Sequence, residues 1–433
     1  MLPADRLGDR RPLPLPDPGP TSATRWIEAH LGDLACDRAP ASADFRGGQT
    51  AADAALDAFS VAGYARRRNT VWPPSRRGAS RLSPYIRHGL LPLGRVWNSV
   101  EAGPPADVAK FRDELLWQEY ARHLYARLGG RLGRSLRWEP PVAQESKNGP
   151  DQVLDPEMAC LAACREELEE KGWIVNQTRM WLASHWSLRR QARWQEGEDY
   201  FFRHLLDGSR AANRLGWQWT SGSASGRPYA FGRHQVMRRA PTFCRGCALR
   251  DACPIEAGQE IGEGAAIEPR EAALRRDSEL AATAGPSIVE RAGAPDAVWL
   301  TAESLGDADP ALRAHPDRPA VFVFDVPLLA RLGLSRKRLI FLVETLADLG
   351  LRRMLEIHRG DPTLVLRNRR LSTTYAPVPG ARRRREELDV VALHPWPWLV
   401  RPHDGPIGSY SAWRKGLEGR VSVEPGQVAR PRA

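Results

Sequence analysis

Apolar residues recur at helical spacing through the first half of the chain, from residue 51 to about residue 205. Turns interrupt the pattern at Pro73–Pro74, Gly129–Gly130 and Pro140–Pro141. No stretch in this half alternates between apolar and polar positions for long, as a half-buried strand would. The pattern therefore predicts an all-helical unit.

The last third of the chain has a different pattern. Its short apolar runs are expected to form strands at residues 298–300, 320–325, 353–358 and 363–367. Residues 335–349 have a helical period instead, with Ser335 placed as the N-cap and Gly350 just beyond the end. Strands that alternate with helices predict a small α/β domain with a parallel sheet.

These patterns divide the 433 residues into five parts. Stretches rich in Pro, Asp and Arg, or in Ala, Glu and Gly, are expected to be linkers. The expected order is an N-terminal linker with one short helical patch at residues 24–34 (1–45), a helical domain that includes a cysteine cluster (46–255), a second linker (256–296), an α/β domain (297–420) and a tail (421–433).

Charge and composition narrow the class of partner. The formal net charge is +11, which suits a polyanion such as DNA, and the chain holds fifteen tryptophans, more than either Phe or Tyr. The first twenty residues contain no apolar signal-peptide core, and no run of 18 apolar residues occurs. We therefore expect a cytoplasmic protein without a membrane span.

Three of the six cysteines crowd into a short segment as Cys244, Cys247 and Cys253, the last followed by a proline. In a reducing cytoplasm such a cluster favours metal over disulfide, and a CxxC with a third Cys can ligate either zinc or an iron–sulfur cluster. Spacing alone leaves these two alternatives open, and a fourth ligand must come from elsewhere.

Three segments carry motifs that occur together in order. Residues 80–89 read SRLSPYIRHG, residues 114–124 read ELLWQEYARHL, and residues 172–219 run from GWIVNQTRM to GWQW. In this order they resemble the photolyase/cryptochrome family over about residues 47–229. The resemblance implies an all-helical FAD-binding photolyase domain. The segment from residue 298 resembles the opening of that family's Rossmann-like parallel α/β antenna domain, which normally comes first, so the implied order is circularly permuted.

The resemblance assigns flavin contacts. The pyrophosphate of FAD needs hydroxyl and backbone donors, ideally where a helix begins, and Ser80 and Ser83 offer them. Taken in isolation, these two serines favour a plain N-cap. Arg179 and Asp207 are implied to pair beside the isoalloxazine, with Asn213 near its N5. The full implied set is Tyr64, Ser80, Leu82, Ser83, Asn176, Arg179, Asp207, Ser209 and Asn213.

A lesion pocket is implied next to the flavin. Glu114 and Trp117 are three residues apart on a predicted helix and so share a face, which by itself also suits a core tryptophan and a solvated acid. By resemblance, Trp117 stacks on a flipped-out pyrimidine dimer, Glu114 hydrogen-bonds a base carbonyl, and Asn176 and Met180 complete the pocket. Arg68 is implied to contact DNA.

Three tryptophans match the family's electron-transfer chain from flavin to surface: Trp217, Trp194 and Trp138. The alternative is that all three are core residues. Closely spaced indoles can pass a hole outward after one of them is oxidised by an excited flavin.

Several positions depart from the family pattern. Ala79 replaces a Thr before the first serine, Ser209 replaces the second acid of an Asp-x-Asp pair, and Gln118 replaces an Arg after the lesion tryptophan. Thr301, Ala302 and Glu303 stand where arginines usually mark the first antenna loop, so no antenna chromophore is assigned. The absence of a His-His pair at residues 175–176 points to cyclobutane dimers rather than (6-4) products.

One branch of the family, the bacterial iron–sulfur cryptochromes and photolyases, resembles the cysteine segment. The branch pattern makes Cys160 the fourth ligand of a four-iron four-sulfur cluster, with Cys164 one turn along the same helix as the alternative. Cys36 is expected to be an unrelated thiol.

The resemblance implies an FAD-dependent, blue-light-driven DNA photolyase, a carbon–carbon lyase that splits cyclobutane pyrimidine dimers by electron transfer from excited reduced flavin. Its partner would be dimer-containing DNA, and we expect a monomer. Two rivals remain: a cryptochrome-type photoreceptor that repairs nothing, favoured by Gln118 and Ser209, and an iron–sulfur DNA-binding flavoprotein without a light role.

Overall fold

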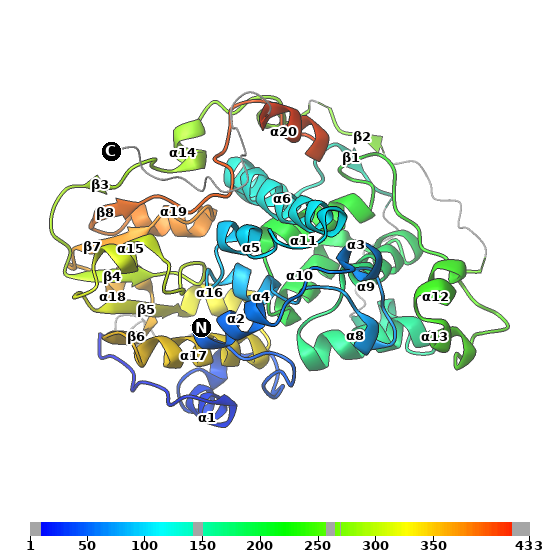
Figure 1. Cartoon of the computed structure of the whole chain (residues 1–433), viewed down its shortest axis with the longest axis horizontal. Coiled ribbons are helices and arrows are strands. Elements are labelled where there is room, and N and C mark those ends of the chain that lie inside the picture. The colour runs from blue at the N-terminus through cyan, green and yellow to red at the C-terminus, as the bar shows by residue number, and fades with distance from the viewer. Residues whose placement is uncertain (1–9, 142–149, 257–264, 269, 418–433) are drawn as a thin grey trace.

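The computed structural model describes residues 10–141, 150–256, 265–268 and 270–417. A helical half and an α/β half pack side by side, and one continuous hydrophobic core draws on both (Figure 1). Within the described residues, no helix is both long and apolar enough to cross a membrane.

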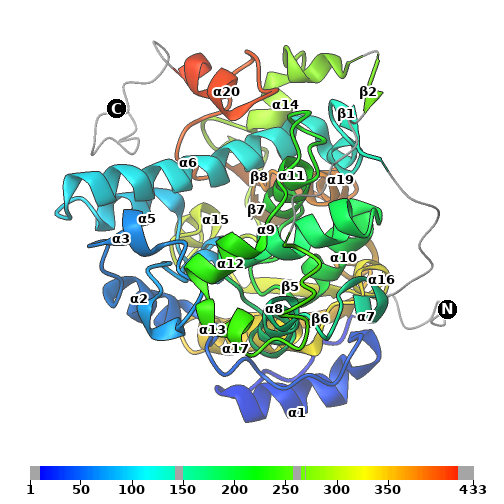
Figure 2. The ribbon, with the colours of Figure 1, turned by 90° about the vertical axis from the view of Figure 1, so that its right-hand side faces the viewer.

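The helical half contains one long helix, α6 (Pro105–Leu128), and shorter helices arranged below it in Figures 1 and 2. Helix α6 has Pro105 at its first position and ends at Gly129, whose φ of 58° is one that residues with a Cβ rarely adopt. The other helices are α2 (Gln49–Asp57), α3 (Tyr64–Arg67), α4 (Ser83–Arg87), α5 (Leu93–Ser99), α7 (Pro150–Val153), α8 (Ala159–Lys171), α9 (Asn176–Ser184), α10 (Trp194–His204), α11 (Arg210–Thr220), α12 (Arg233–Arg239) and α13 (Pro241–Arg245). The prediction of a helical first half is confirmed.

The α/β half is built on a six-stranded sheet of order β3-β8-β7-β4-β5-β6. All pairs are parallel except β3 with β8. Numbered from β4, the parallel strands have the order 3-2-1-4-5, which is that of a doubly wound fold. The strands are β3 (Glu290–Arg291), β4 (Ala297–Leu300), β5 (Ala320–Asp325), β6 (Leu355–Gly360), β7 (Leu371–Thr374) and β8 (Val390–His394), and the helices are α15 (Pro310–Ala314), α16 (Val326–Leu332), α17 (Arg336–Gly350), α18 (Pro362–Val365) and α19 (Pro379–Glu386).

The prediction of a parallel α/β domain is therefore confirmed, with one strand wrong. Residues 363–367 do not form a strand, because Asp361 accepts a hydrogen bond from the Thr363 backbone N–H at 2.9 Å and Pro362 begins the short helix α18. Ser335 is the N-cap residue of α17, but its side chain makes no capping bond. Asp37 accepts the hydrogen bond from the Arg336 N–H instead, at 2.9 Å.

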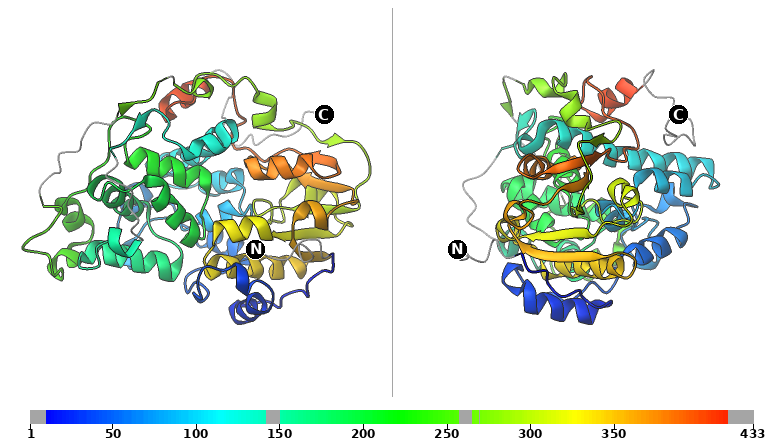
Figure 3. Two further views of the ribbon diagram at one scale, coloured as in Figure 1. Left: turned by 180° about the vertical axis from the view of Figure 1, so that it is seen from behind. Right: turned by 90° about the vertical axis from the view of Figure 1, so that its left-hand side faces the viewer.

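The N-terminal segment is not a linker over its described residues, 10–45, which corrects the sequence prediction. Helix α1 (Pro20–His30) buries Ala23, Trp26 and Ile27 and packs along α17. The Leu13 N–H donates to the Ile357 carbonyl at 2.6 Å on the edge strand β6. Figure 3 shows this N-terminal segment, in dark blue, lying against the α/β half, which is formed by the C-terminal part of the sequence.

The described part of the second predicted linker also packs. Strand β2 (Ala265–Ala266) pairs with β1 (Trp138–Glu139), helix α14 (Leu280–Ala284) contacts α6, and β3 completes the sheet edge. It connects the two halves along the upper side of the molecule in Figure 1.

The last described helix, α20 (Tyr410–Leu417), returns to the helical half and lies on α6 (Figures 1 and 2). The Trp413 indole N–H donates to His123 Nδ1 at 2.9 Å, and the Tyr120 hydroxyl donates to the Ile407 carbonyl at 2.9 Å. Burial lowers the pKa of His123 to about 3, so this imidazole is neutral and its Nδ1 can accept the hydrogen bond from the indole N–H. The chain thus closes on itself around α6.

Candidate functional site

The loop before α4 has a strained backbone. Arg81 adopts a left-handed φ of 60°, a conformation that costs a residue with a Cβ about 1–3 kcal/mol. Its guanidinium pairs with Asp44 at 2.9 Å and lies over the Trp173 ring. The neighbouring Ser80 Oγ accepts from the Leu82 N–H at 3.4 Å, and Ser83 Oγ accepts from the Trp173 indole at 3.0 Å. Neither serine caps α4, so the plain N-cap alternative is not what the structure contains.

Tyr64 lies at the start of α3, with its ring edge-on to Phe111 at 4.9 Å between centroids. Asp107 fixes the turn that leads into this helix by accepting from the Gly63 N–H at 2.7 Å and the Ala65 N–H at 2.8 Å. Burial raises the pKa of the Tyr64 phenol, which therefore stays protonated. The ring packs against Phe59 and against Phe111 of α6.

The predicted pair beside the flavin is formed. Arg179 Nη2 donates to Asp207 Oδ2 at 2.8 Å, and its Nε donates to the Ile174 carbonyl at 3.1 Å. The other oxygen of this carboxylate, Asp207 Oδ1, is buried without a hydrogen-bond partner among the described residues, and so is Asn213 Nδ2. A buried acceptor and a buried donor without partners are costly unless a ligand satisfies them.

Cationic residues hold the loop between these two groups. Arg87 Nε donates to the Gly208 carbonyl at 2.9 Å, and Arg338 Nη2 donates to the same oxygen at 3.1 Å. Arg338 comes from α17 of the α/β half and also donates to the Phe202 carbonyl. Ser209 is the N-cap residue of α11 without a side-chain cap. The α/β half therefore fixes the loop that carries the flavin-directed groups.

The first predicted lesion wall lies on α6. Glu114 Oε1 pairs with Arg68 Nε at 3.1 Å and with Lys110 Nζ at 3.0 Å. Trp117 stacks on Tyr410 of α20, with ring centroids 4.0 Å apart and planes inclined by 11°. The indole keeps part of its surface exposed. Arg68, whose contact with DNA stays a prediction, pairs with the acid on this wall.

Helix α9 presents the second predicted wall. Asn176 Nδ2 contacts Met180 Sδ at 3.6 Å, one turn along the helix, and the asparagine is exposed. Neither side chain is buried in the core, so both are open to a ligand.

The three predicted electron-transfer tryptophans are connected only indirectly, through other residues. Trp217 is 2% exposed and Trp194 is 3% exposed. A Cβ on Gly197 would lie 2.1 Å from the Trp217 ring, so α10 can approach this indole only because glycine stands one turn after Trp194. The Trp194 indole N–H donates to Ser135 Oγ at 3.3 Å, three residues before Trp138 on β1.

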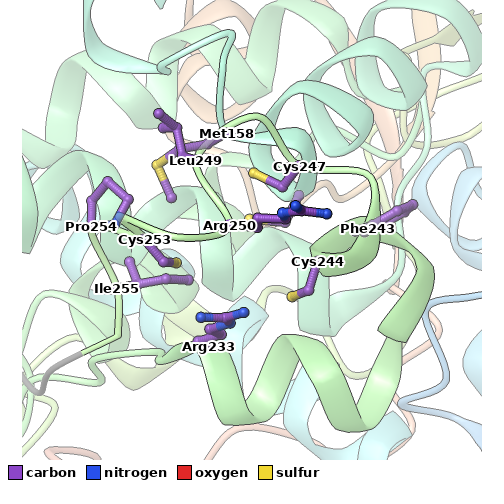
Figure 4. Close-up of a pocket in the computed structure, with 11 residues that line it drawn as sticks. Met158, Arg233, Phe243, Cys244, Cys247, Leu249, Arg250, Cys253, Pro254 and Ile255 are labelled. Atoms are coloured by element: carbon purple, nitrogen blue, oxygen red, sulfur yellow. The ribbon is translucent and has the colours of Figure 1, made fainter.

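The predicted thiols line one pocket, in which Figure 4 labels Cys244, Cys247 and Cys253. Cys160 from α8 lines it together with Cys244, Cys247 and Cys253, whereas Cys164 does not line it. Burial, together with the three other thiols of the pocket, raises the pKa of Cys160 to about 12. Within the described residues, no three Cys, His, Asp or Glu side chains are arranged to hold a single metal ion.

Comparisons with known proteins agree with this geometry. The model of the "FAD binding domain of DNA photolyase" matches residues 159–242, the part that holds Arg179, Asp207, Asn213 and Trp217. A curated deoxyribodipyrimidine photo-lyase from Vibrio cholerae is 32% identical over 168 residues, covering 36% of this chain and 36% of the relative. Another from Synechococcus is 31% identical over 194 residues, covering 41% and 39%.

The chain resembles the photolyase/cryptochrome family through its FAD-binding region. It spans well under half the length of the curated photolyases that it matches. Among solved structures, a class III photolyase from Agrobacterium tumefaciens overlaps 52% of this chain and 46% of that chain, with 22% identity and a TM-score of 0.41.

One exposed aromatic residue close to Asn176 in the fold was not predicted as a site residue from the sequence. Trp219 is 41% exposed, although Trp217, two residues earlier, is buried. Its ring lies 5.6 Å from that of Tyr229, whose hydroxyl accepts from Gln177 Nε2 at 3.0 Å, next to Asn176. Residues two apart on a helix point to nearly opposite sides, so the Trp-x-Trp spacing already signalled one core and one surface indole.

Proposed function

We propose that this chain is an FAD-dependent, light-driven DNA photolyase that splits cyclobutane pyrimidine dimers. The observation that carries the proposal is that buried polar atoms without hydrogen-bond partners among the described residues occur together with partly exposed lesion-contact residues. Buried polar atoms without partners, Asp207 Oδ1 and Asn213 Nδ2, lie in the matched FAD-binding region. The predicted lesion-contact residues Glu114, Trp117, Asn176 and Met180 remain open to solvent at least in part.

The residues present fit the flavin. Arg179 and Asp207 form a buried charged pair that can hydrogen-bond a polar ring edge, and Asn213 offers a free amide donor. The strained loop of Ser80, Leu82 and Ser83, together with Tyr64, would hold the phosphates and ribose. When bound, FAD would supply the light-driven electron that opens the dimer, with no net redox change.

The lesion would contact two sets of side chains. Trp117 and Trp219 offer aromatic faces to an extruded base, and stacking of this kind contributes about 1–3 kcal/mol per base. Glu114, already held by Arg68 and Lys110, would hydrogen-bond the base, accepting from a ring N–H as a carboxylate or donating to a carbonyl oxygen when protonated. The net charge of +11 supports phosphate binding that weakens with salt.

We also propose that the cysteine pocket holds a four-iron four-sulfur cluster through Cys160, Cys244, Cys247 and Cys253. All four thiols line this one pocket, and the resemblance to the iron–sulfur branch favours a cluster over a single zinc ion. Cys164 is excluded as the fourth ligand in this proposal because it does not line the pocket. Loss of iron in Cys160→Ser but not in Cys164→Ser would support this assignment, and a fully loaded sample with zinc and no iron would refute it.

A second function, a cryptochrome-type photoreceptor, is favoured by one contact. Tyr410 covers a face of Trp117, so part of the predicted stacking surface is already occupied. Gln118 and Ser209 also depart from the dimer-repairing pattern. An antenna chromophore remains unassigned in our proposal, and we retain a monomeric, cytoplasmic protein as its working state.

The test is a repair assay on DNA that carries a single dimer. The wild type should bind this DNA more tightly than the undamaged duplex and remove the dimer only in light. Glu114→Ala should lower the repair yield per photon more than it lowers affinity, because the lost hydrogen bond is strongest to the developing anionic base. Trp117→Ala should instead weaken dimer binding.

Glu166→Gln, at an exposed position of α8, is the matched control and should behave as wild type. Normal flavin loading without any light-dependent loss of dimers would replace the photolyase proposal with the photoreceptor.

A further inference from the structure

A second aromatic path leaves Trp217 in a direction that the predicted tryptophan chain does not use. Trp186 lies in the π-helical turn η5 (His185–Arg189) and meets Trp217 edge-on, with centroids 6.1 Å apart and planes at 90°. Both indoles are almost fully buried, at 3% and 2% exposure. Single π-turns inside helices are frequent at functional sites.

The path continues to a tyrosine. Tyr200 on α10 stacks beside Trp186, with centroids 6.1 Å apart and planes inclined by only 18°. This phenol is 4% exposed. Three aromatic rings from η5, α10 and α11 therefore form one contiguous series inside the helical half.

The tyrosine differs from the indoles in having a proton acceptor. Its hydroxyl donates to Glu169 Oε1 at 2.6 Å, a short charge-assisted bond, and Arg165 Nε binds the same oxygen at 3.0 Å. Glu169 has 37% of its side chain exposed, so a proton taken there can reach water. The Trp186 N–H instead donates to the Arg193 carbonyl at 3.1 Å, and a carbonyl does not take the proton.

We propose that Trp186, Tyr200 and Glu169 form a second electron-donating branch that ends in a tyrosyl radical. The inference rests on the proposed flavin function, since the photoexcited oxidised flavin is the one-electron oxidant. One electron passes from Tyr200 through Trp186 and Trp217 to that flavin, and the phenolic proton of Tyr200 moves to Glu169. Tyr200 ends as a neutral radical, the flavin gains one electron, and both tryptophans return to their starting state.

The branch and the predicted chain share Trp217 and then diverge. On the predicted chain, Trp194 donates its N–H to Ser135 Oγ, and Trp138 Nε1 has no hydrogen-bond partner among the described residues. Neither indole has a carboxylate to take a proton. The charge on Tyr200 is removed by proton transfer, so the radical there should outlive an indole cation radical on the other route.

The first experiment uses apoprotein, so its result does not depend on flavin binding. An indole-selective one-electron oxidant, the azide radical made by pulse radiolysis, is used to oxidise tryptophan, and the tyrosyl absorption is followed. Tyr200→Phe and Trp186→Phe should each remove the same kinetic phase of tyrosyl formation. Tyr375→Phe, which removes a buried tyrosine whose hydroxyl donates to backbone carbonyls, is the matched control and should retain it.

The second experiment uses the flavin-loaded chain under anaerobic flash illumination with electron paramagnetic resonance detection. Trp194→Phe should still photoreduce and show a tyrosyl signal, whereas Trp194→Phe combined with Tyr200→Phe should lose both. Glu169→Gln, which cannot take the proton, should lose the tyrosyl signal while keeping the fold. Unchanged tyrosyl formation in Tyr200→Phe and Trp186→Phe apoprotein would overturn the branch and leave these rings as core residues. Absence of bound flavin would instead refute the proposed function.

Discussion

Carboxylates at two places in the molecule are used in opposite ways. At the carboxyl edge of the sheet, Asp309 accepts from the Ala311 and Leu312 N–H groups at 3.0 Å each, and Asp325 and Asp361 both pair with Arg384. In the helical half, Asp207 binds Arg179 with one oxygen and leaves the other buried without a described partner.

The difference separates structural acids from ligand-directed ones. An acid that caps a helix and completes an ion pair has its hydrogen-bonding capacity used by the fold. An acid left half satisfied in a buried loop raises the free energy of the unliganded protein, and a ligand recovers that cost on binding. Function is therefore expected in the helical half, with the sheet half as its support.

The largest expected effect comes from breaking the ligand-directed acid. Asp207→Asn replaces a charged hydrogen-bond acceptor, and such bonds are worth about 1.5–3 kcal/mol, or roughly a tenfold to hundredfold weaker FAD affinity. Titration of apoprotein with FAD measures this. Asp309→Asn is the matched control at the sheet edge and should keep wild-type FAD affinity. Equal losses in both variants would erase the distinction between the two regions.

The second expected effect is a pH dependence of folding stability that arises from Asp309 at the edge of the sheet. Burial raises the pKa of Asp309 to about 6, above its ordinary value of 3.8. The folded state then holds a proton that the unfolded state has already released, so the stability contributed by the protonated group is lost as pH rises from about 4 to about 6. The slope should reach at most about 1.4 kcal/mol per pH unit.

Asp309→Asn mimics the protonated acid and should flatten this part of the stability profile, measured by urea unfolding at a series of pH values. A variant that keeps the wild-type slope would show that another group is responsible.

A smaller effect tests whether the C-terminal segment only supports the lesion wall. Tyr410 contacts Asp113 and Trp117, which lie four residues apart on one stripe of α6, whereas Glu114 faces Arg68. We expect Tyr410 to back the indole and hold it in place. Tyr410→Ala should then weaken binding of dimer-containing DNA by about 0.5–1.5 kcal/mol, the usual value of an aromatic pair, in a competition assay. Tighter binding would mean that α20 occupies the place of the lesion.

Local periodicity predicted much of the fold. The buried strand β5 and the helix α17 each have a strong pattern within one segment, and both were found at nearly the expected residues. Strand β7, with the sequence LSTT, was not predicted, because its polar residues are buried only by their central position in the sheet. Helix α1 was expected to belong to a linker, since its partner α17 lies some 300 residues away in sequence.

The site divides in the same way. Motifs within one segment identified Arg179, Asp207 and the four cysteines that line one pocket. Contacts between distant segments could not be found from the sequence, and these include the stack of Tyr410 on Trp117 and the series from Trp217 to Tyr200. Such contacts depend on how helices cross, which no spacing along a single helix contains.

The most direct test of the central claim is the effect of FAD on the stability of the apoprotein. With free FAD at about 100 times its dissociation constant, the free energy of unfolding should rise by about 2.7 kcal/mol, since ligand binds only the folded chain. At that same FAD concentration, Asp207→Asn should gain less than the wild type, and Asp309→Asn should gain as much. No stabilisation of the wild type by FAD at any concentration would contradict the assignment of the unpaired Asp207 and Asn213 atoms to the flavin.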